Sequence, residues 1–311
     1  RGLERDKDTL ADPYRPEQVV IGLLDPYSLD DELGWLADRD ISAFALELMP
    51  RIGRAQRMDV LSSMASIGGY KSVAVAAEAS PKMFPMEMTA AGTIQPAEVF
   101  VIGAGVAGLK AVATAGRLGA SVRAYDIRLE VKQEVESLGA EFVELDLETE
   151  GSGDEEGYAR EMDEEFYRQQ RKQLSRVVPE SDIVITTAAI PGRPAPELVT
   201  TAMIEDMATG SVIVDVSAAT GGNCEPTQPG ETVQHGGVTI FGPTNLPATV
   251  PETASQLFAN NLYNFLDNLF EDGELVVDPA DEIVDSTLLT HAGTIRAPHR
   301  TEPEDDTTDE D

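Results

Sequence analysis

The chain has 311 residues, of which 41% are apolar, so it is long enough to form two domains with separate cores. Its 56 acidic and 23 basic residues give a net charge of −33, which excludes nucleic acid as a partner because phosphate binding requires clustered positive charge. The single cysteine, Cys224, excludes an internal disulfide framework.

The first eighty residues alternate between predicted strands and helices. Residues 17–26 and 41–48 are apolar runs of strand length, and the segment 29–40 between them is predicted as a helix. A longer helix is expected over 54–80. We therefore expect residues 1–80 to form a smaller N-terminal α/β domain with its linking helix.

Strand and helix alternate more regularly after a turn-rich crossing at 83–96. In chain order we expect strands at 97–103, 121–126, 141–145, 182–189, 211–217 and 238–242, and helices at 106–118, 129–139 and 198–207. Strands that alternate with helices of this length are typical of a parallel, doubly wound sheet. Residues 81–248 are therefore predicted to form a Rossmann-type domain.

The C-terminal part begins with another helix. Residues 249–270 are predicted as a long helix and 285–293 as a short apolar segment, and we expect residues 249–295 to pack on the first domain. The last ten residues contain seven carboxylates, and a segment of this composition cannot bury enough apolar surface to fold. Residues 296–311 are therefore predicted to be a disordered acidic tail.

A glycine fingerprint, Gly103-x-Gly105-x-x-Gly108, lies between a predicted strand and a predicted helix. Gly103 allows the tight turn, Gly105 lets the backbone approach a pyrophosphate, and Gly108 lets helix and strand pack closely. The start of the helix offers N–H groups and a partial positive charge to the phosphates. The fingerprint predicts a dinucleotide site, and the alternative is a glycine-rich turn that binds no ligand.

Asp126 ends the next predicted strand and indicates which dinucleotide is preferred. Its carboxylate would accept hydrogen bonds from the adenine ribose and would repel a 2′-phosphate, which predicts NAD(H). Arg128, two residues later, weakens this rejection of NADP(H).

A second group of polar side chains lies at 51–62. Arg51, Gln56, Asp59 and Ser62 combine a fixed charge, an amide, a carboxylate and a hydroxyl, and the last three recur every three residues, which places them near one edge of a helix. The set is poor for acid–base catalysis but suited to holding a carboxamide, because it contains both donors and acceptors. The alternative is a polar helix start whose charges are solvated.

The histidines and the cysteine point to no other chemistry. His235, His291 and His299 lie far apart in the sequence and in no acid–base motif, so we expect no metal centre. Cys224 lies in a glycine-rich turn with no histidine nearby in sequence, so we expect a small packed side chain rather than a nucleophile.

At several of these stretches the sequence resembles the NAD(H)-binding component of the proton-translocating NAD(P) transhydrogenases, which are relatives of alanine dehydrogenase. The stretches include RIGRAQRMDVLSSMASIGGYKSV, FPMEMTAAGTIQPAEVFVIGAGVAGLKAVATAGRLGASVRAYDIR and TNLPATVPETASQLFANNL. The resemblance covers roughly residues 17 to 295, and R-A-Q-x-M-D and F-P-M-x-M-T-A-A-G-T are its most specific motifs.

The resemblance implies a set of residues around NAD(H). The segment 51–62 contacts the nicotinamide end, where Gln56 and Asp59 are expected to act in catalysis by setting the angle of the donor ring. The resemblance also implies a mobile loop at 151–162 that closes over the cofactor, whereas the residues alone favour a solvated acidic loop. The implied cofactor-binding residues are Arg51, Gln56, Asp59, Ser62, Gly103, Gly105, Val106, Gly108, Asp126, Ile127, Arg128, Gly157 and Tyr158.

The resemblance also implies an activity, namely direct transfer of a hydride from NADH on this chain to NADP+ on a partner subunit, in the Si-specific/Re-specific class. Position 219 is Ala, where alanine dehydrogenases have a catalytic Asp, and this argues against amino-acid oxidation. The family has further residues before the point matching Arg1, so we expect the smaller domain to be incomplete. An alanine dehydrogenase-like enzyme and a non-catalytic NAD(H)-binding module remain alternatives.

The expected partners are NADP-binding and membrane-spanning subunits, and the resemblance implies a homodimer. No apolar run approaches the length of a membrane span, so we expect a cytoplasmic chain that meets the membrane only through its partners. The charge of −33 with few lysines indicates a protein of concentrated salt, where such self-repulsion is screened. An ordinary acidic protein is the alternative.

Overall fold

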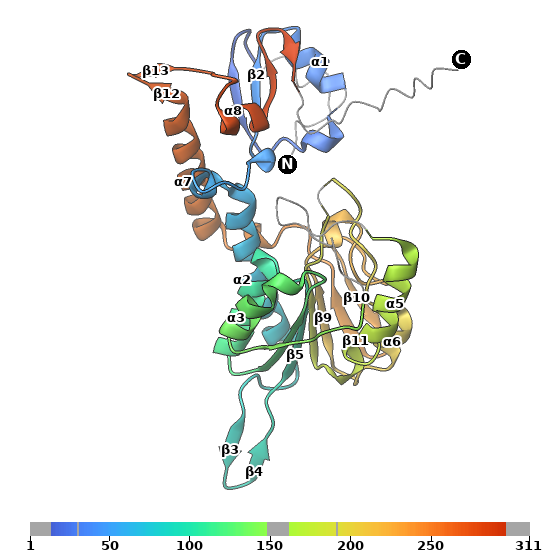
Figure 1. Ribbon diagram of the computed structural model, residues 1–311. Helices are drawn as coiled ribbons and strands as arrows, with labels where there is room; N and C mark the ends of the chain where they lie inside the picture. The colour runs from blue at the N-terminus through green and yellow to red at the C-terminus, as the bar shows by residue number, and fades with distance from the viewer. Residues whose placement is uncertain (1–13, 30, 148–161, 191, 297–311) are drawn as a thin grey trace, which may run out of the picture. The chain divides into compact units, whose positions relative to one another are not determined.

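The computed structural model describes residues 14–29, 31–147, 162–190 and 192–296 (Figure 1). The chain forms two compact units. Ser62–Ala254 make the larger one, and the described residues up to Leu61 and from Ser255 onward make the smaller one. The limits expected from the sequence were 80/81 and 248/249.

The larger unit contains a seven-stranded sheet in the order β10-β11-β9-β8-β5-β6-β7. All neighbouring strands are parallel except β10 and β11, which form an antiparallel pair at the edge. The α/β class with a large parallel sheet is thereby confirmed. The strands are β5 (Glu98–Ile102), β6 (Ser121–Tyr125), β7 (Glu141–Phe142), β8 (Ile183–Thr186), β9 (Val212–Asp215), β10 (Thr232–His235) and β11 (Val238–Phe241).

Helices cover both faces of this sheet because successive strand residues point to opposite sides. Val99 and Val101 of β5 belong to one buried cluster, and Phe100 and Ile102 belong to the other. The first cluster includes residues of α2 (Val60–Ala79), α3 (Val106–Arg117) and α4 (Lys132–Ser137), and the second includes residues of α5 (Glu164–Leu174) and α6 (Thr201–Glu205) (Figure 1).

Most of α2 packs in the larger unit, although the helix was expected to belong to the N-terminal domain. Val73 and Ala76 are buried in the first core cluster. Gly69 lies so close to α3 that a Cβ there would be 2.0 Å from the carbonyl oxygen of Ala107. This close approach fixes α2 against α3.

The segment 83–96, expected as a turn-rich crossing, contains a two-stranded hairpin. Its strands, β3 (Glu87–Thr89) and β4 (Gly92–Ile94), pair in antiparallel register. The hairpin projects from the rest of the larger unit (Figure 1). Met88 is 74% exposed, so the hairpin presents apolar surface to its surroundings.

The smaller unit is built on a four-stranded sheet in the order β1-β2-β14-β15. Its leucine-rich core includes Leu33 and Leu36, and Phe44 packs edge-to-face on Phe265 with ring centroids 5.4 Å apart. The elements are β1 (Val19–Gly22), α1 (Asp31–Ala37), β2 (Ser42–Ala45), α7 (Pro251–Leu269), β12 (Phe270–Glu271), β13 (Glu274–Leu275), α8 (Glu282–Thr287), β14 (Leu288–His291) and β15 (Thr294–Ile295).

The remaining helical elements are single 3-10 turns. They are Pro26–Ser28, Leu46–Leu48, Gln56–Met58, Leu129–Val131, Val178–Glu180, Ala218–Thr220 and Leu246–Thr249. Within the part of the chain that the structure describes, we find no helix with the length and hydropathy that a membrane span requires.

Candidate functional site

The glycine loop, defined as Gly103–Gly108, joins β5 to α3 at the point where the strand order reverses between β5 and β8. Ligands of doubly wound sheets bind at this switch point. Gly103 has φ +93, a left-handed conformation that favours glycine. Thr187, just after β8, donates a hydrogen bond from its hydroxyl to the Gly103 carbonyl at 3.0 Å. The turn is therefore held from two strands.

Gly105 and Gly108 differ in what surrounds them. A Cβ on Gly108 would lie 1.8 Å from the Gly103 carbonyl oxygen, so the contact between loop and helix requires glycine. A Cβ on Gly105 would meet no protein atom within 4 Å. Gly105 is also the N-cap of α3 and has no side chain to accept hydrogen bonds from the first turn. A pyrophosphate fits this loop, and the assignment of Gly103, Gly105, Val106 and Gly108 to it stays a prediction.

Asp126 follows β6 and is buried, with 6% of its surface exposed. Its Oδ2 accepts a hydrogen bond from the Ala104 N–H of the glycine loop at 2.7 Å. Arg128 donates three more, from its backbone N–H and Nε to Oδ1 and from Nη2 to Oδ2, all within 2.9 Å. The ion pair with Asp126 raises the pKa of Arg128. The predicted contact of Asp126 with a ribose is untested, but the side chain already anchors the loop. Ile127 is half-buried against the second core cluster.

The segment 51–62 does not form one helix, and the prediction of a shared helix edge is wrong. Gln56 lies in a 3-10 turn that ends at Met58, Asp59 has extended backbone with φ −72 and ψ 95, and Ser62 lies in the first turn of α2. Arg51 and Gln56 are exposed and Asp59 is half-buried. Whether these side chains contact a cofactor stays a prediction.

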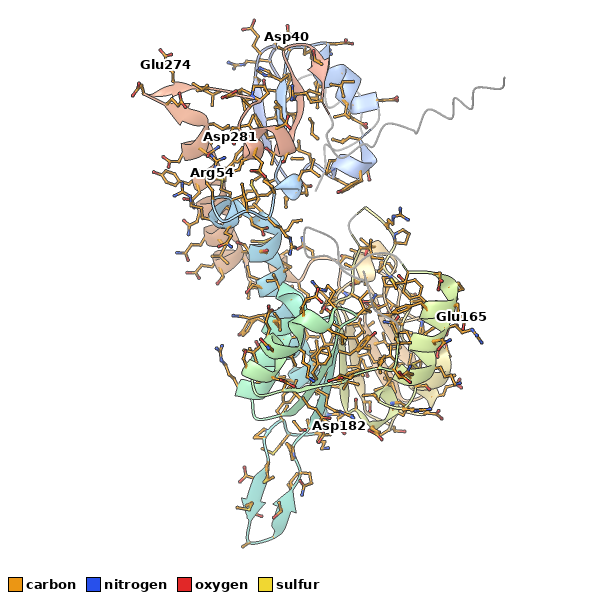
Figure 2. The ribbon with its side chains drawn as sticks, in the orientation of Figure 1. Asp40, Arg54, Glu165, Asp182, Glu274 and Asp281 are labelled. Carbon is orange, nitrogen blue, oxygen red and sulfur yellow. The ribbon has the colours of Figure 1, made fainter. Side chains whose placement is uncertain are left out.

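Helix α7 explains the break at Asp59. The carbonyl oxygen of Arg57 accepts hydrogen bonds from the side-chain amides of Asn261 at 2.9 Å and Asn264 at 3.3 Å. These amides take the place of the backbone N–H that a continuous helix would supply. Arg54 and Asp281 form an ion pair at 2.7 Å in the same unit (Figure 2). The polar segment is therefore anchored to α7 and to the start of α8.

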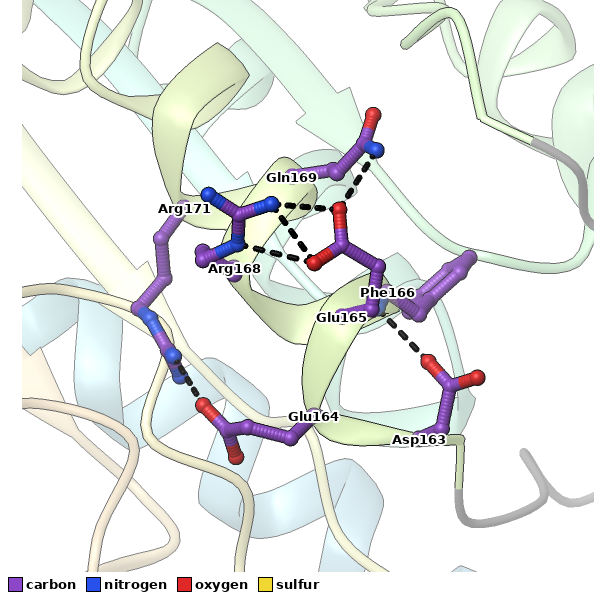
Figure 3. Close-up of polar contacts among 7 residues, drawn as sticks. All are labelled: Asp163, Glu164, Glu165, Phe166, Arg168, Gln169 and Arg171. Atoms are coloured by element: carbon purple, nitrogen blue, oxygen red, sulfur yellow. Dashed lines mark hydrogen bonds and ion pairs between the residues drawn. The ribbon is translucent and has the colours of Figure 1, made fainter.

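The expected closing loop at 151–162 falls outside the described residues, except for Met162. Gly157 and Tyr158, two of the predicted cofactor-binding residues, therefore lie outside the described residues. Helix α5 follows the loop, and Figure 3 shows its first turns. Asp163 caps the helix by accepting a hydrogen bond from the Phe166 N–H at 2.7 Å.

Polar contacts of Arg171 connect the end of α5 to its first turn and to the segment after β8. Glu164 pairs with Arg171 at 2.6 Å (Figure 3). Arg171 also donates to the Glu197 carbonyl at 3.2 Å. An open hollow of about 420 Å³ lies between these segments, lined by Glu164, Tyr167, Arg171, Ile190, Pro194, Ala195, Pro196 and Glu197. None of the predicted site residues lines it.

Asp215, a fully buried carboxylate at the end of β9, was not among the residues predicted from the sequence. Its two oxygens accept five hydrogen bonds, and the donors are the Thr186 and Thr227 hydroxyls and the backbone N–H groups of Ser217, Asn223 and Cys224. Burial raises the pKa of Asp215, and these bonds oppose that shift. The signal available in the sequence was a charged residue ending an apolar strand run, VIVD.

The segment that Asp215 organises contains two residues singled out from the sequence. Ala219 is exposed in the 3-10 turn Ala218–Thr220. Cys224 is buried in the second core cluster, and burial together with the charge of Asp215 raises the pKa of its thiol to about 12. The prediction that Cys224 is a packed side chain is confirmed.

Comparison with known proteins identifies the family. The alanine dehydrogenase/PNT C-terminal domain matches residues 72–298, and the N-terminal domain of the same family matches 4–68. A protein of Rickettsia prowazekii, named as the first part of the NAD(P) transhydrogenase alpha subunit, is 46% identical over 277 residues. The match covers 89% of this chain and 72% of that protein.

Two solved structures resemble the fold. The transhydrogenase of Sinorhizobium meliloti matches with a TM-score of 0.80 and 44% identity, over 91% of this chain and 76% of that one. An L-alanine dehydrogenase matches with a TM-score of 0.72 and 25% identity, over 92% of this chain and 74% of that one. Because both domains of the family match, this chain belongs to the alanine dehydrogenase/PNT family.

Proposed function

We propose that the chain is the NAD(H)-binding subunit of a proton-translocating NAD(P) transhydrogenase of the Si-specific/Re-specific type. It would pass a hydride between NADH and NADP+ held on a partner subunit. The observation that carries the proposal is the 46% identity over 277 residues to a protein named for the alpha subunit of an NAD(P) transhydrogenase. The glycine loop, with its open space at Gly105, supports it.

The chain's own residues bind and orient the cofactor. When bound, the nicotinamide supplies the hydride at its C4 carbon. The glycine loop and the first turn of α3 would hold the pyrophosphate, while Arg51, Gln56, Asp59 and Ser62 would orient the carboxamide. Ring-to-ring transfer needs close approach and alignment but no acid or base on the protein.

The proposal requires partners, since one glycine loop positions one nicotinamide. NADP(H) would be held on a second subunit, and proton movement would occur in a membrane-spanning subunit that keeps this chain at the cytoplasmic face. We also propose a homodimer, which the exposed apolar side chains of Met86, Met88 and Ile94 around the β3–β4 hairpin support. Light scattering that gives the mass of a single chain at micromolar concentration would contradict the dimer.

The competing activity in the same family is alanine oxidation, which needs an acid–base group beside the reacting carbon. At position 219 this chain has an alanine. The isolated chain should therefore bind NADH and produce no NADH from alanine and NAD+. Alanine-dependent NADH production would contradict the proposal.

A single added methyl group at Gly105 tests the binding mode. The Gly105→Ala variant should fold normally, because its Cβ meets no protein atom within 4 Å and the residue has φ −75. If the pyrophosphate lies against this backbone, the Kd for NADH should rise about tenfold or more. The measurement is a fluorescence titration in concentrated KCl, paired with thermal unfolding.

Gly116→Ala is the matched control. Gly116 lies in α3, and a Cβ there also meets nothing within 4 Å. Its NADH affinity should equal that of the wild type. An unchanged affinity in Gly105→Ala would remove the glycine loop from the proposed site.

A further inference from the structure

Two kinds of donor, backbone N–H groups and the Arg128 guanidinium, share the Asp126 carboxylate. A carboxylate offers about four lone-pair sites, and all four have donors here. The Ala104 N–H and the Arg128 N–H are backbone groups, one on each oxygen, at 2.7 and 2.9 Å. Nε and Nη2 of Arg128 fill the other two sites, again one on each oxygen, at 2.9 and 2.8 Å.

The two backbone donors cannot leave Asp126 unless the backbone moves, because the Ala104 N–H belongs to the glycine loop and the Arg128 N–H to the residues after β6. The two guanidinium donors can leave by rotation of one side chain. A ribose presents two vicinal hydroxyls, which would replace Nε–H and Nη2–H as donors to the two oxygens. The Arg128 side chain therefore occupies the hydrogen-bonding positions that a ribose diol would need.

We propose that Arg128 is a specificity-determining residue. Its guanidinium competes with the adenine ribose for Asp126, and this competition lowers the discrimination between NADH and NADPH. The inference rests on the proposed function and adds a specific role for this arginine.

The charge of the pair explains the effect on NADPH. Both side chains are poorly exposed, at 12% for Arg128 and 6% for Asp126, so their charges are weakly screened by solvent. While Arg128 remains close, the carboxylate presents little net negative charge to a 2′-phosphate. A guanidinium displaced by the ribose would stay on the same short segment, and a guanidinium suits the bidentate recognition of phosphate.

The test compares Kd values for NADH and NADPH in wild type and Arg128→Ala, by calorimetric titration at one fixed KCl concentration. Removing the competing guanidinium should strengthen the binding of NADH. Exposing the Asp126 charge should weaken the binding of NADPH. The ratio of the NADPH Kd to the NADH Kd should rise about tenfold or more, a change of about 1.4 kcal/mol. Asp126→Asn should lower the ratio, because an amide nitrogen replaces one acceptor oxygen.

Arg123→Ala is the matched control, since Arg123 lies on β6 and pairs with the exposed Glu180 at 3.1 Å. Its ratio should equal that of the wild type. Arg128→Lys keeps the charge without the planar fork and should give a ratio between those of wild type and Arg128→Ala. It serves as the test if Arg128→Ala does not fold.

The outcomes separate this inference from the proposed function. Wild-type protein that binds neither dinucleotide contradicts both. Wild-type protein that binds NADH, with an unchanged ratio in Arg128→Ala, contradicts the inference alone and leaves Arg128 as an anchor of the loop. Weaker NADH binding in Arg128→Ala would make the arginine a ligand of the cofactor and would also overturn the competition.

Discussion

At the scale of single residues, buried carboxylates organise two loops at the carboxyl edge of the large sheet, namely the glycine loop and the segment after β9. Asp126 bonds to the glycine loop through the Ala104 N–H, and Asp215 gathers the segment after β9 through five donors. The two differ in charge balance: Arg128 neutralises Asp126, whereas the five donors to Asp215 are neutral hydroxyl and backbone groups. Asp215 therefore acts through hydrogen bonds to its loop.

The Asp215→Asn variant tests this role. An amide keeps the size of the side chain but replaces one acceptor with a donor, so at least one buried N–H or hydroxyl loses its acceptor. The free energy of unfolding should fall by about 2 kcal/mol or more. Denaturant unfolding in concentrated KCl measures it. Asp206→Asn, at an exposed position, should stay within about 0.5 kcal/mol of wild type; equal stability of the two variants would contradict the account.

At the scale of elements, α2 and α3 are held together by the contact at Gly69. The carbonyl of Ala107 occupies the space that a side chain would need, so the crossing depends on a residue without a Cβ. Because α3 begins at the glycine loop, the contact also fixes the position of α2 relative to that loop.

Gly69→Ala should therefore lower the free energy of unfolding by about 1–3 kcal/mol, because a Cβ 2.0 Å from a backbone oxygen forces the helices apart. Gly116→Ala adds the same methyl group where no atom lies within 4 Å, and it should raise the free energy of unfolding by about 0.5–1 kcal/mol. Chemical denaturation measures both. A neutral or stabilising Gly69→Ala would show that α2 can shift at no cost.

The accuracy of the sequence prediction also differs from element to element. β5, α3 and β6 end within one residue of their predicted limits, since the apolar run of β5 and the glycines that bound α3 are local signals. The hairpin at 83–96 was missed because its two strands have only three residues each and expose their apolar side chains, Met88 and Ile94, so no alternating pattern is visible. The break at Asp59 was missed because its cause, Asn261, lies 204 residues away from Arg57. Long-range hydrogen bonds of this kind leave no mark on local periodicity.

At the scale of the whole molecule, the net charge of −33 makes repulsion between acidic side chains the main electrostatic effect on the folded state. The screening length falls from about 10 Å at 0.1 M salt to about 3 Å at 1 M, so self-repulsion falls steeply as salt rises. We expect the folded state to lose stability on dialysis into dilute buffer.

Cys224 reports this loss directly. The thiol is 2% exposed and its pKa is about 12, so a thiol reagent at pH 8 should not react with the folded chain in multimolar KCl. In dilute buffer the thiol should become reactive as the chain unfolds. An unreactive thiol and an unchanged melting temperature at low salt would contradict the dependence on salt.

The central claim, that this chain presents NADH to a nicotinamide on another protein, is tested most directly by cyclic transhydrogenation. The chain is mixed with a purified NADP-binding subunit carrying bound NADP+, and reduction of an NAD analogue by NADH is followed. We predict turnover only when both proteins are present. Gln56→Ala should lower the rate about ten- to a hundredfold, or about 1.4–2.7 kcal/mol of lost alignment, with NADH affinity nearly unchanged. No turnover with a partner that is active with a known transhydrogenase subunit would contradict the claim.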